Sequence, residues 1–127
     1  MQNKRWAVLA VAAGLAMIAG PIFAHHGVGP FDTRRSTTVK GTITKFDFIQ
    51  PHVQMYFDVK NDNGAVEKWS AESASPNMMH RAGWDRNTLK PGDQITATGN
   101  PAKDGSTSMR LTKLVMASGQ EFIPWLN

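Results

Sequence analysis

The sequence predicts a mainly β protein: a small five-stranded Greek-key barrel with one short helix between the third and fourth strands. Residues 53–60 alternate between apolar and polar side chains, which is the period of a strand with one buried face. Residues 39–48 change the parity of their apolar positions, which predicts a bulged first strand that curves enough to close a barrel. Turn and helix signals divide the rest of the chain into three further strands, a short helix and a short final strand.

Residues 1–24 have the features of a secretory signal peptide. Lys4 and Arg5 form a basic start, and residues 6–19 are apolar. A Gly-Pro break then precedes the small residue Ala24. The alternative is a membrane anchor, but the apolar run is shorter than the roughly 20 residues that a spanning helix needs. We therefore expect cleavage after Ala24 and a periplasmic or secreted protein without stable membrane insertion.

The charge and cysteine content exclude several classes of function. The chain has 14 Lys and Arg against 10 Asp and Glu, and two of the basic residues, Lys4 and Arg5, belong to the expected leader. The mature domain is therefore close to neutral, which argues against nucleic acid as a partner. The chain has no cysteine, so disulfides, thiolate metal sites and a cysteine nucleophile are excluded.

The first two strands meet at Gln50-Pro51-His52. In the first strand, Val39 and Ile43 share one parity while Phe46 and Phe48 share the other, so we expect a bulge between the two pairs. Proline has no N–H to donate, so it ends the pairing and leaves His52 at the mouth of the barrel. The second strand is expected to bury Val53, Met55, Phe57 and Val59 and to expose Gln54, Tyr56 and Asp58.

The third strand and the helix follow from turn and cap residues. Asn63-Gly64 predicts a hairpin turn because both residues tolerate positive φ, so residues 65–73 should form an antiparallel third strand. Ser75 as N-cap, Pro76 at the first helical position and Gly83 at the C-terminus then predict a short helix.

The later strands are expected at residues 94–99, 109–116 and 120–123. A second parity change, between Leu111 and Leu114, predicts another bulge. Met79 and Trp84 should pack the helix under the barrel. Three strands, a helix and two further strands are the order of the oligonucleotide/oligosaccharide-binding (OB) fold. The expected domains are the signal peptide at 1–24, an N-terminal arm at 25–38 and an OB-like barrel at 39–127, with Phe31 holding the arm on the barrel.

Several motifs of the mature chain also resemble DUF6152, a family of small exported bacterial proteins of unknown function. These motifs are His25-His26, Gln50-Pro51-His52-Val53, Ser75-Pro76-Asn77, Arg81 with Gly83-Trp84, and Leu89-Lys90-Pro91-Gly92-Asp93. The chain departs from the family pattern at Gln50, where the family usually has asparagine. The resemblance implies an exported OB-like barrel and leaves the function open, because the family has no established activity.

The histidines form the one constellation in the sequence that could carry chemistry. Cleavage after Ala24 would make His25 the first residue, whose amine and imidazole could together chelate a metal. With His52, and with His26 beside it, this set suits Cu(II), which binds nitrogen ligands tightly. The alternative is that His25-His26 is a polar start to the chain and that His52 donates a hydrogen bond to a loop carbonyl.

His80 and Met78 lie together in the predicted helix. A thioether beside an imidazole could hold Cu(I), which prefers soft ligands. The competing interpretation is that Met78 fills a gap in the core, as methionine often does.

Enzyme signatures are absent from the sequence. No serine has the GxSxG setting of a nucleophile elbow, and Ser75 is needed as a helix cap. Glu72 and Asp58 lie on neighbouring strands and are expected to be solvated or salt-bridged. The sequence therefore predicts that the protein is not an enzyme.

The sequence supports two functional hypotheses. In the first, an exported protein binds copper through His25, His26 and His52. In the second, a periplasmic OB module binds a peptide, a glycan or a partner protein without metal, through Tyr56, Gln54 and the loop at residues 49–52.

Overall fold

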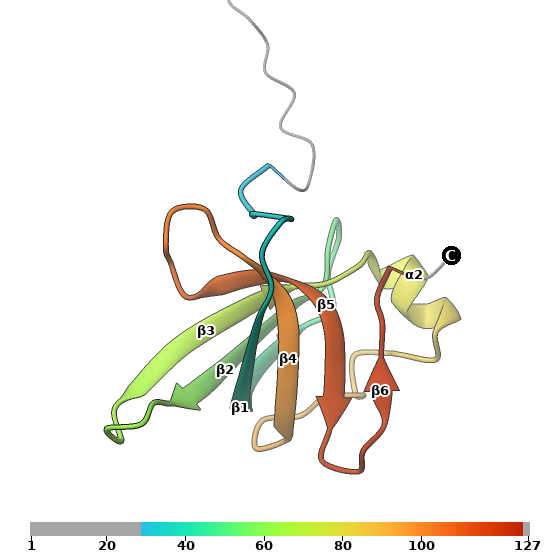
Figure 1. The fold of residues 1–127 in the computed structure, drawn as a ribbon. Helices are drawn as coiled ribbons and strands as arrows, with labels where there is room; N and C mark the ends of the chain where they lie inside the picture. Colours follow the sequence, from blue (N-terminus) through green and yellow to red (C-terminus); the bar gives the residue numbers. More distant parts are fainter. Residues whose placement is uncertain (1–28, 126–127) are drawn as a thin grey trace, which may run out of the picture.

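A computed structural model describes residues 29–125 of the chain. This part is built almost entirely from β-strands, with one short helix (Figure 1). The elements follow in the order β1 (Thr37–Asp47), β2 (Gln54–Lys60), β3 (Val66–Glu72), α2 (Pro76–Arg81), β4 (Gln94–Pro101), β5 (Ser108–Met116) and β6 (Glu121–Phe122).

The strands form a single sheet in the order β3-β2-β1-β4-β5-β6, and an additional pairing of β3 with β5 closes it into a barrel. The closing contact is parallel and joins residues 70–72 to residues 108–110. All other pairings are antiparallel. Because β6 adds only to the side of β5, five strands make the barrel. The predicted five-stranded barrel with a helix between the third and fourth strands is confirmed.

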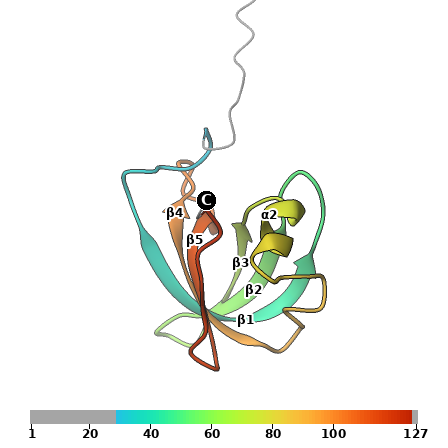
Figure 2. The same cartoon turned by 90° about the vertical axis from the view of Figure 1, so that its right-hand side faces the viewer.

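β1 is long and strongly curved, and it pairs with β4 in its first half and with β2 in its second (Figure 2). Its register with β2 shifts between Ile43 and Lys45. This is the position at which the sequence changes the parity of its apolar residues, so the predicted bulge is confirmed. A bulge lets one strand bury Ile43 before the shift and turn Phe46 toward the core after it.

The hairpin between β2 and β3 forms as predicted, but its turn differs from the expected one. Among the residues that the structure describes, only glycines have positive φ, so Gly64 (φ 84°) is left-handed and Asn63 is not. The N–H of Ala65 instead donates to the side-chain oxygens of Asn61 and Asn63, at 2.9 and 3.0 Å. Two asparagine side chains therefore stabilise a longer turn that needs a single left-handed residue.

The helix α2 begins and ends at the predicted signals. Ser75 caps it by accepting from the N–H of Met78, and Pro76 occupies its first position. At the other end, Gly83 (φ 85°) donates to the carbonyl of His80, and Trp84 donates to that of Met79, both at 2.9 Å. This pair of hydrogen bonds is the Schellman motif, which needs a left-handed residue at the position of Gly83.

β4 and β5 also follow the predicted pattern, with somewhat different ends. β4 extends to Pro101 and β5 begins at Ser108, whereas β6 is limited to two residues. The register of β4 with β5 shifts between Thr98 and Gly99, opposite the predicted parity change in β5. The second bulge is therefore confirmed.

The core fills the barrel and extends under α2. Met55, Phe57, Leu111 and Leu114 are almost fully buried between the strands. Met79 and Trp84, which are also buried, join α2 to this core as predicted.

The N-terminal arm is held at one end of the barrel. Phe31 is buried, forms a bridge with Ala102, and is followed by a hydrogen bond of 2.9 Å from the N–H of Asp32 to the carbonyl of Pro101. Lys103 donates from Nζ to the carbonyl of Gly29 at 2.7 Å. The expected role of Phe31 is thus confirmed, and β1 begins at Thr37, inside the segment predicted as arm. Within residues 29–125, no helix has the length and apolar character needed to cross a membrane.

Candidate functional site

A hollow lies on the outer face of β1, β2 and β3. Its volume is about 530 Å³. Three strands contribute to it, and so does the loop between β4 and β5. The lining residues are Thr44, Lys45, Tyr56, Phe57, Asp58, Lys68, Trp69, Ser70, Ser106, Thr107 and Ser108.

Tyr56 lines this hollow because of the register of β2. Phe57, its neighbour, points into the core, so Tyr56 points outward, as the sequence predicts. Lys45 of β1 and Ser70 of β3 are its partners on the two sides. The ammonium group of Lys45 lies 5.4 Å from the centre of the Tyr56 ring, within the range of a cation–π contact.

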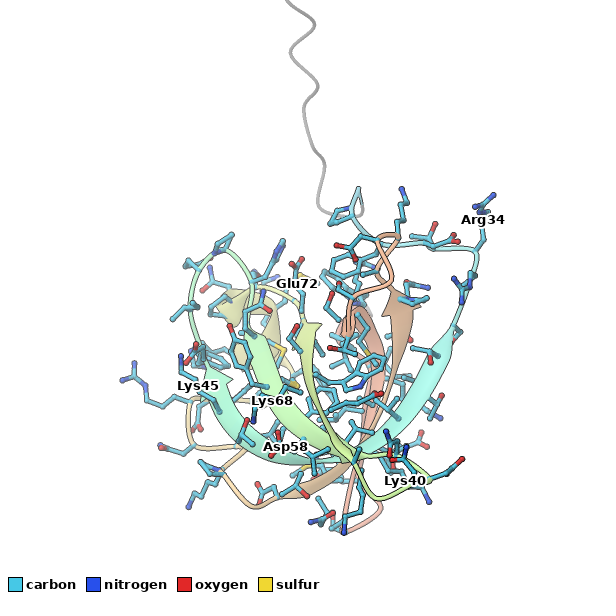
Figure 3. All side chains as sticks on the ribbon, turned by 90° about the vertical axis from the view of Figure 1, so that its left-hand side faces the viewer. Arg34, Lys40, Lys45, Asp58, Lys68 and Glu72 are labelled. Carbon is cyan, nitrogen blue, oxygen red and sulfur yellow. The ribbon has the colours of Figure 1, made fainter. Side chains whose placement is uncertain are left out.

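Each lysine of the hollow has a carboxylate partner. Lys45 donates to Asp47 at 2.7 Å, and this hydrogen bond raises the pKa of the lysine. Lys68 donates to Asp58 at 3.4 Å across β2 and β3. Figure 3 shows Lys45, Lys68 and Asp58 together on this face. The face therefore presents charged groups of both signs near the ring of Tyr56.

The loop between β4 and β5 forms the far wall of the hollow. The N–H of Ser70 donates to the carbonyl of Thr107 at 3.1 Å, and the hydroxyl of Thr107 donates to the carbonyl of Lys68 at 2.6 Å. Within the loop, hydrogen bonds from Ser106 lower the pKa of Asp104. The contacts to β3 hold three hydroxyl-bearing residues, Ser106, Thr107 and Ser108, at the edge of the hollow.

His52 lies apart from this hollow, at the end of the barrel where the chain enters β2. Its Nδ1 atom lies 2.9 Å from Oε1 of Glu72, and its ring centre lies 6.3 Å from that of Trp125. Trp125 in turn stacks on Arg110, whose Cζ atom is 3.7 Å from the ring centre, and donates its indole N–H to the carbonyl of Leu111. His52 thus contacts a carboxylate rather than the loop carbonyl that the sequence suggested.

The other predicted site residues are spread over the molecule. His80 is exposed and packs its ring against Phe48 at 4.9 Å, while Met78 is half-buried against the core. Gln54 lies on the outer face of β2 but beyond the hollow. His25 and His26 lie outside the described residues. Among residues 29–125, the structure shows no group of three His, Asp or Glu side chains arranged to hold a metal ion.

Sequence reasoning identified Tyr56 but missed the lysines and the loop that surround it. Lys45 and Lys68 have the parity of the outer face, so the strand register was a signal for both. The sequence analysis assigned no function to the loop at residues 103–107. The OB order was the signal for considering it, because OB barrels use the loop between their fourth and fifth strands in binding.

The sequence and the fold both have relatives. The model of DUF6152, described as a family of unknown function, matches residues 11–110. No curated protein is significantly similar in sequence. The mitochondrial single-stranded DNA-binding protein of S. cerevisiae is similar in structure, with a TM-score of 0.51 and 8% identity over 65% of this chain and 93% of that one. A ZRD-deleted mutant of TiaS in complex with agmatine has a TM-score of 0.47 and 16% identity, over 73% of this chain and 27% of that one. At these identities the likeness concerns the fold alone.

Proposed function

This chain belongs to the DUF6152 family, whose function is unknown, and we propose that it is an exported binding domain that holds an extended ligand on the outer face of β1, β2 and β3. One observation carries the proposal. The hollow of about 530 Å³ combines these strands with the loop between β4 and β5. OB barrels bind oligonucleotides and oligosaccharides on this face and with this loop.

The side chains of the hollow favour binding over catalysis. Asp58 is the one carboxylate that lines it and is paired with Lys68, and no histidine lines it to activate the serines at its edge. Tyr56 offers a ring on which a flat ligand can stack, and the hydroxyls around it can donate and accept hydrogen bonds.

Binding on this face is testable by NMR. We would titrate ¹⁵N-labelled mature protein with oligosaccharides, extended peptides and single-stranded DNA. The proposal expects shift changes confined to the outer face of β1–β3 and to residues 103–107 for at least one of these probes. Tyr56→Ala should reduce its affinity at least tenfold, while Tyr56→Phe should retain most of it.

Ile123→Ala, just after β6, is the matched control, because it removes an exposed apolar side chain that does not line the hollow. Shift changes that map elsewhere, or an affinity that is the same in the Tyr56→Ala variant, would refute the proposal.

Copper binding is a second candidate, and the contact between His52 and Glu72 favours it. Metal-binding histidines usually direct their second ring nitrogen at a carboxylate, which orients the ring. With Nδ1 of His52 facing Glu72, the Nε2 atom is the nitrogen available to a metal. The first described residues of the arm and the loop of His52 lie at the same end of the barrel (Figures 1 and 2). His25 and His26 would have to complete the site from the preceding segment.

Calorimetry with Cu(II) and Zn(II) tests this candidate. If the mature protein starts at His25, it should bind one Cu(II) more tightly than Zn(II). Adding one alanine before His25 moves only the amine, so the affinity should fall sharply. Glu72→Ala should lower it by about 10–100-fold. Amine and imidazole nitrogens bind metals only when deprotonated, so the affinity should also fall as the pH drops below about 8. If both variants bind copper as tightly as the unchanged protein, copper binding is refuted and His25-His26 is only a polar start to the chain.

A further inference from the structure

A second hollow lies on the same outer face, further along β1 and β2. Its volume is about 330 Å³, and its lining includes Lys40 and Thr42 of β1, Lys60 of β2 and Gln94 of β4. Asp58 lines both this hollow and the one around Tyr56. Because the two hollows share Asp58, they form consecutive parts of one path across the sheet.

The two parts of this path differ in charge. Around Tyr56, each lysine has a carboxylate partner. In the second hollow, neither Lys40 nor Lys60 forms an ion pair with any residue of the described part of the chain. Thr42 pairs with Asp58, so the next outward position on each strand is a lysine, Lys40 on one and Lys60 on the other. Both lysines line the same hollow, where their like charges are mutually unfavourable, and an anion bound there would reduce this cost.

We propose that one ligand occupies both hollows and that it is an acidic polysaccharide, with a sugar ring on Tyr56 and a carboxylate between Lys40 and Lys60. This inference rests on the proposed binding function of the same face. Sugar rings stack on aromatic side chains through their C–H groups, and their hydroxyls suit the serines and paired charges at the first hollow. The second hollow then selects for a negative group some distance along the same chain.

Other polymers fit this path less well. A nucleic acid carries a charge on every nucleotide and gains affinity by neutralising many phosphates. Here it would meet Asp58 in both hollows, and Lys45 and Lys68 are already neutralised by carboxylates. A peptide gains affinity by pairing its backbone with a free strand edge. The path instead crosses the faces of β1 and β2, whose backbones are paired with neighbouring strands. A polymer with sparse carboxylates and many hydroxyls matches both parts.

The test compares ligand length and ligand charge by calorimetry. We would measure binding of disaccharides and octasaccharides from hyaluronan, unsulfated chondroitin and heparosan, which carry a carboxylate on every second sugar. Their carboxyl-reduced forms and a 15-nucleotide oligo-dT would be measured beside them. At least one acidic octasaccharide should bind ten times more tightly than its disaccharide. Reducing its carboxylates, or introducing Lys40→Gln with Lys60→Gln, should each lower that affinity at least tenfold. Binding of the reduced octasaccharide to the Lys40→Gln, Lys60→Gln variant should be little weaker than with either change alone. Lys113→Gln, on β5, is the matched control for loss of a surface charge.

Each outcome separates this inference from the proposed function. Equal binding of acidic and reduced octasaccharides, both weakened by Tyr56→Ala, would overturn the acidic class and leave the binding face intact. Tighter binding of oligo-dT than of every glycan, again weakened by Tyr56→Ala, would identify nucleic acid instead. Absence of binding by every acidic octasaccharide at 1 mM would also overturn the inference. If a probe binds and its affinity is unchanged in the Tyr56→Ala variant, the proposed binding face itself is contradicted.

Discussion

The two faces of β2 differ in burial and in polarity although they alternate along the same seven residues. On the inner face, Met55 and Phe57 are 0% and 1% exposed and belong to the core. On the outer face, Tyr56 and Asp58 are half-buried and line the hollow. If the outer face binds a ligand as proposed, one strand provides stability with one parity and binding with the other. A change on one face should then leave the property of the other intact.

The largest expected effect is the loss of Phe57. Phe57→Ala should lower the free energy of unfolding by about 3–5 kcal/mol, because it empties a buried aromatic site. Small domains have total stabilities of about 5–15 kcal/mol, so the loss would be severe. Tyr56→Ala should lower the stability by about 1 kcal/mol or less. Urea melts of the two variants measure the difference, and equal losses would contradict the division between the faces.

The second prediction concerns Gly41, a buried position of β1 that lies close to the neighbouring strand β2. A Cβ atom at Gly41 would lie 2.7 Å from Cδ2 of Phe57 and 2.8 Å from the carbonyl oxygen of Asp58. Gly41→Ala should therefore destabilise the protein by about 1–3 kcal/mol through overpacking. Lys40→Ala, at the neighbouring outward position, should change the stability by about 0.5 kcal/mol or less. Thermal unfolding of both variants would show whether the close approach is real, since a neutral Gly41→Ala would mean that the strands can separate there.

A smaller effect is expected from the ion pair of Asp58 and Lys68 on the outer face. The Lys68 side chain is 86% exposed and the two charged atoms are 3.4 Å apart. A double-mutant cycle with Asp58→Asn and Lys68→Met should give a coupling of about 0.2–1 kcal/mol, because exposed pairs are weak. The coupling should decrease in 1 M salt, where charges are screened. A coupling energy as large as the unfolding free energy lost in Phe57→Ala would show that the outer face also determines stability.

The smallest effect is expected in the loop that borders the hollow. Hydrogen bonds from the side chain and the backbone of Ser106 lower the pKa of Asp104 below its ordinary value. A carboxyl group with a lowered pKa in the folded state stabilises the fold above its ordinary pKa, and this contribution disappears as the pH falls through the lowered value. Ser106→Ala should raise the pKa of Asp104 in an NMR titration. Ser118→Ala, in the turn before β6, should leave it unchanged, and the same shift in both variants would contradict the assignment.

The fold was largely predictable because its signals are local. The alternation in β2, the parity change at Ile43 and Phe46, and the caps of α2 each depend on residues within a few positions of one another. The turn at Asn63-Gly64 was predicted in place but not in detail. Its conformation depends on which side-chain oxygens reach the N–H of Ala65, and residue preferences alone do not specify that.

The candidate site was predictable only in part, because its contacts join residues that are far apart in sequence. Tyr56 could be assigned to the outer face from the parity of β2 alone. Its neighbours come from strands and a loop far away in sequence, such as Lys45 and Ser106. Their assembly depends on the registers of several strand pairs at once, and one residue of slip in any pair would turn the side chains to the other face.

The amino-acid sequence by itself determined where the strands, the bulges, the helix and the turns lie, because hydrogen bonding and side-chain periodicity act between neighbours. The tertiary structure decided how the barrel closes. The parallel pairing of β3 with β5 brings the loop at residues 103–107 to Tyr56. The fold also placed Glu72 against His52. It placed Lys40 and Lys60 in a second hollow, which shares Asp58 with the hollow around Tyr56. These contacts arise from curvature and twist accumulated over the whole sheet, which no short stretch of sequence encodes.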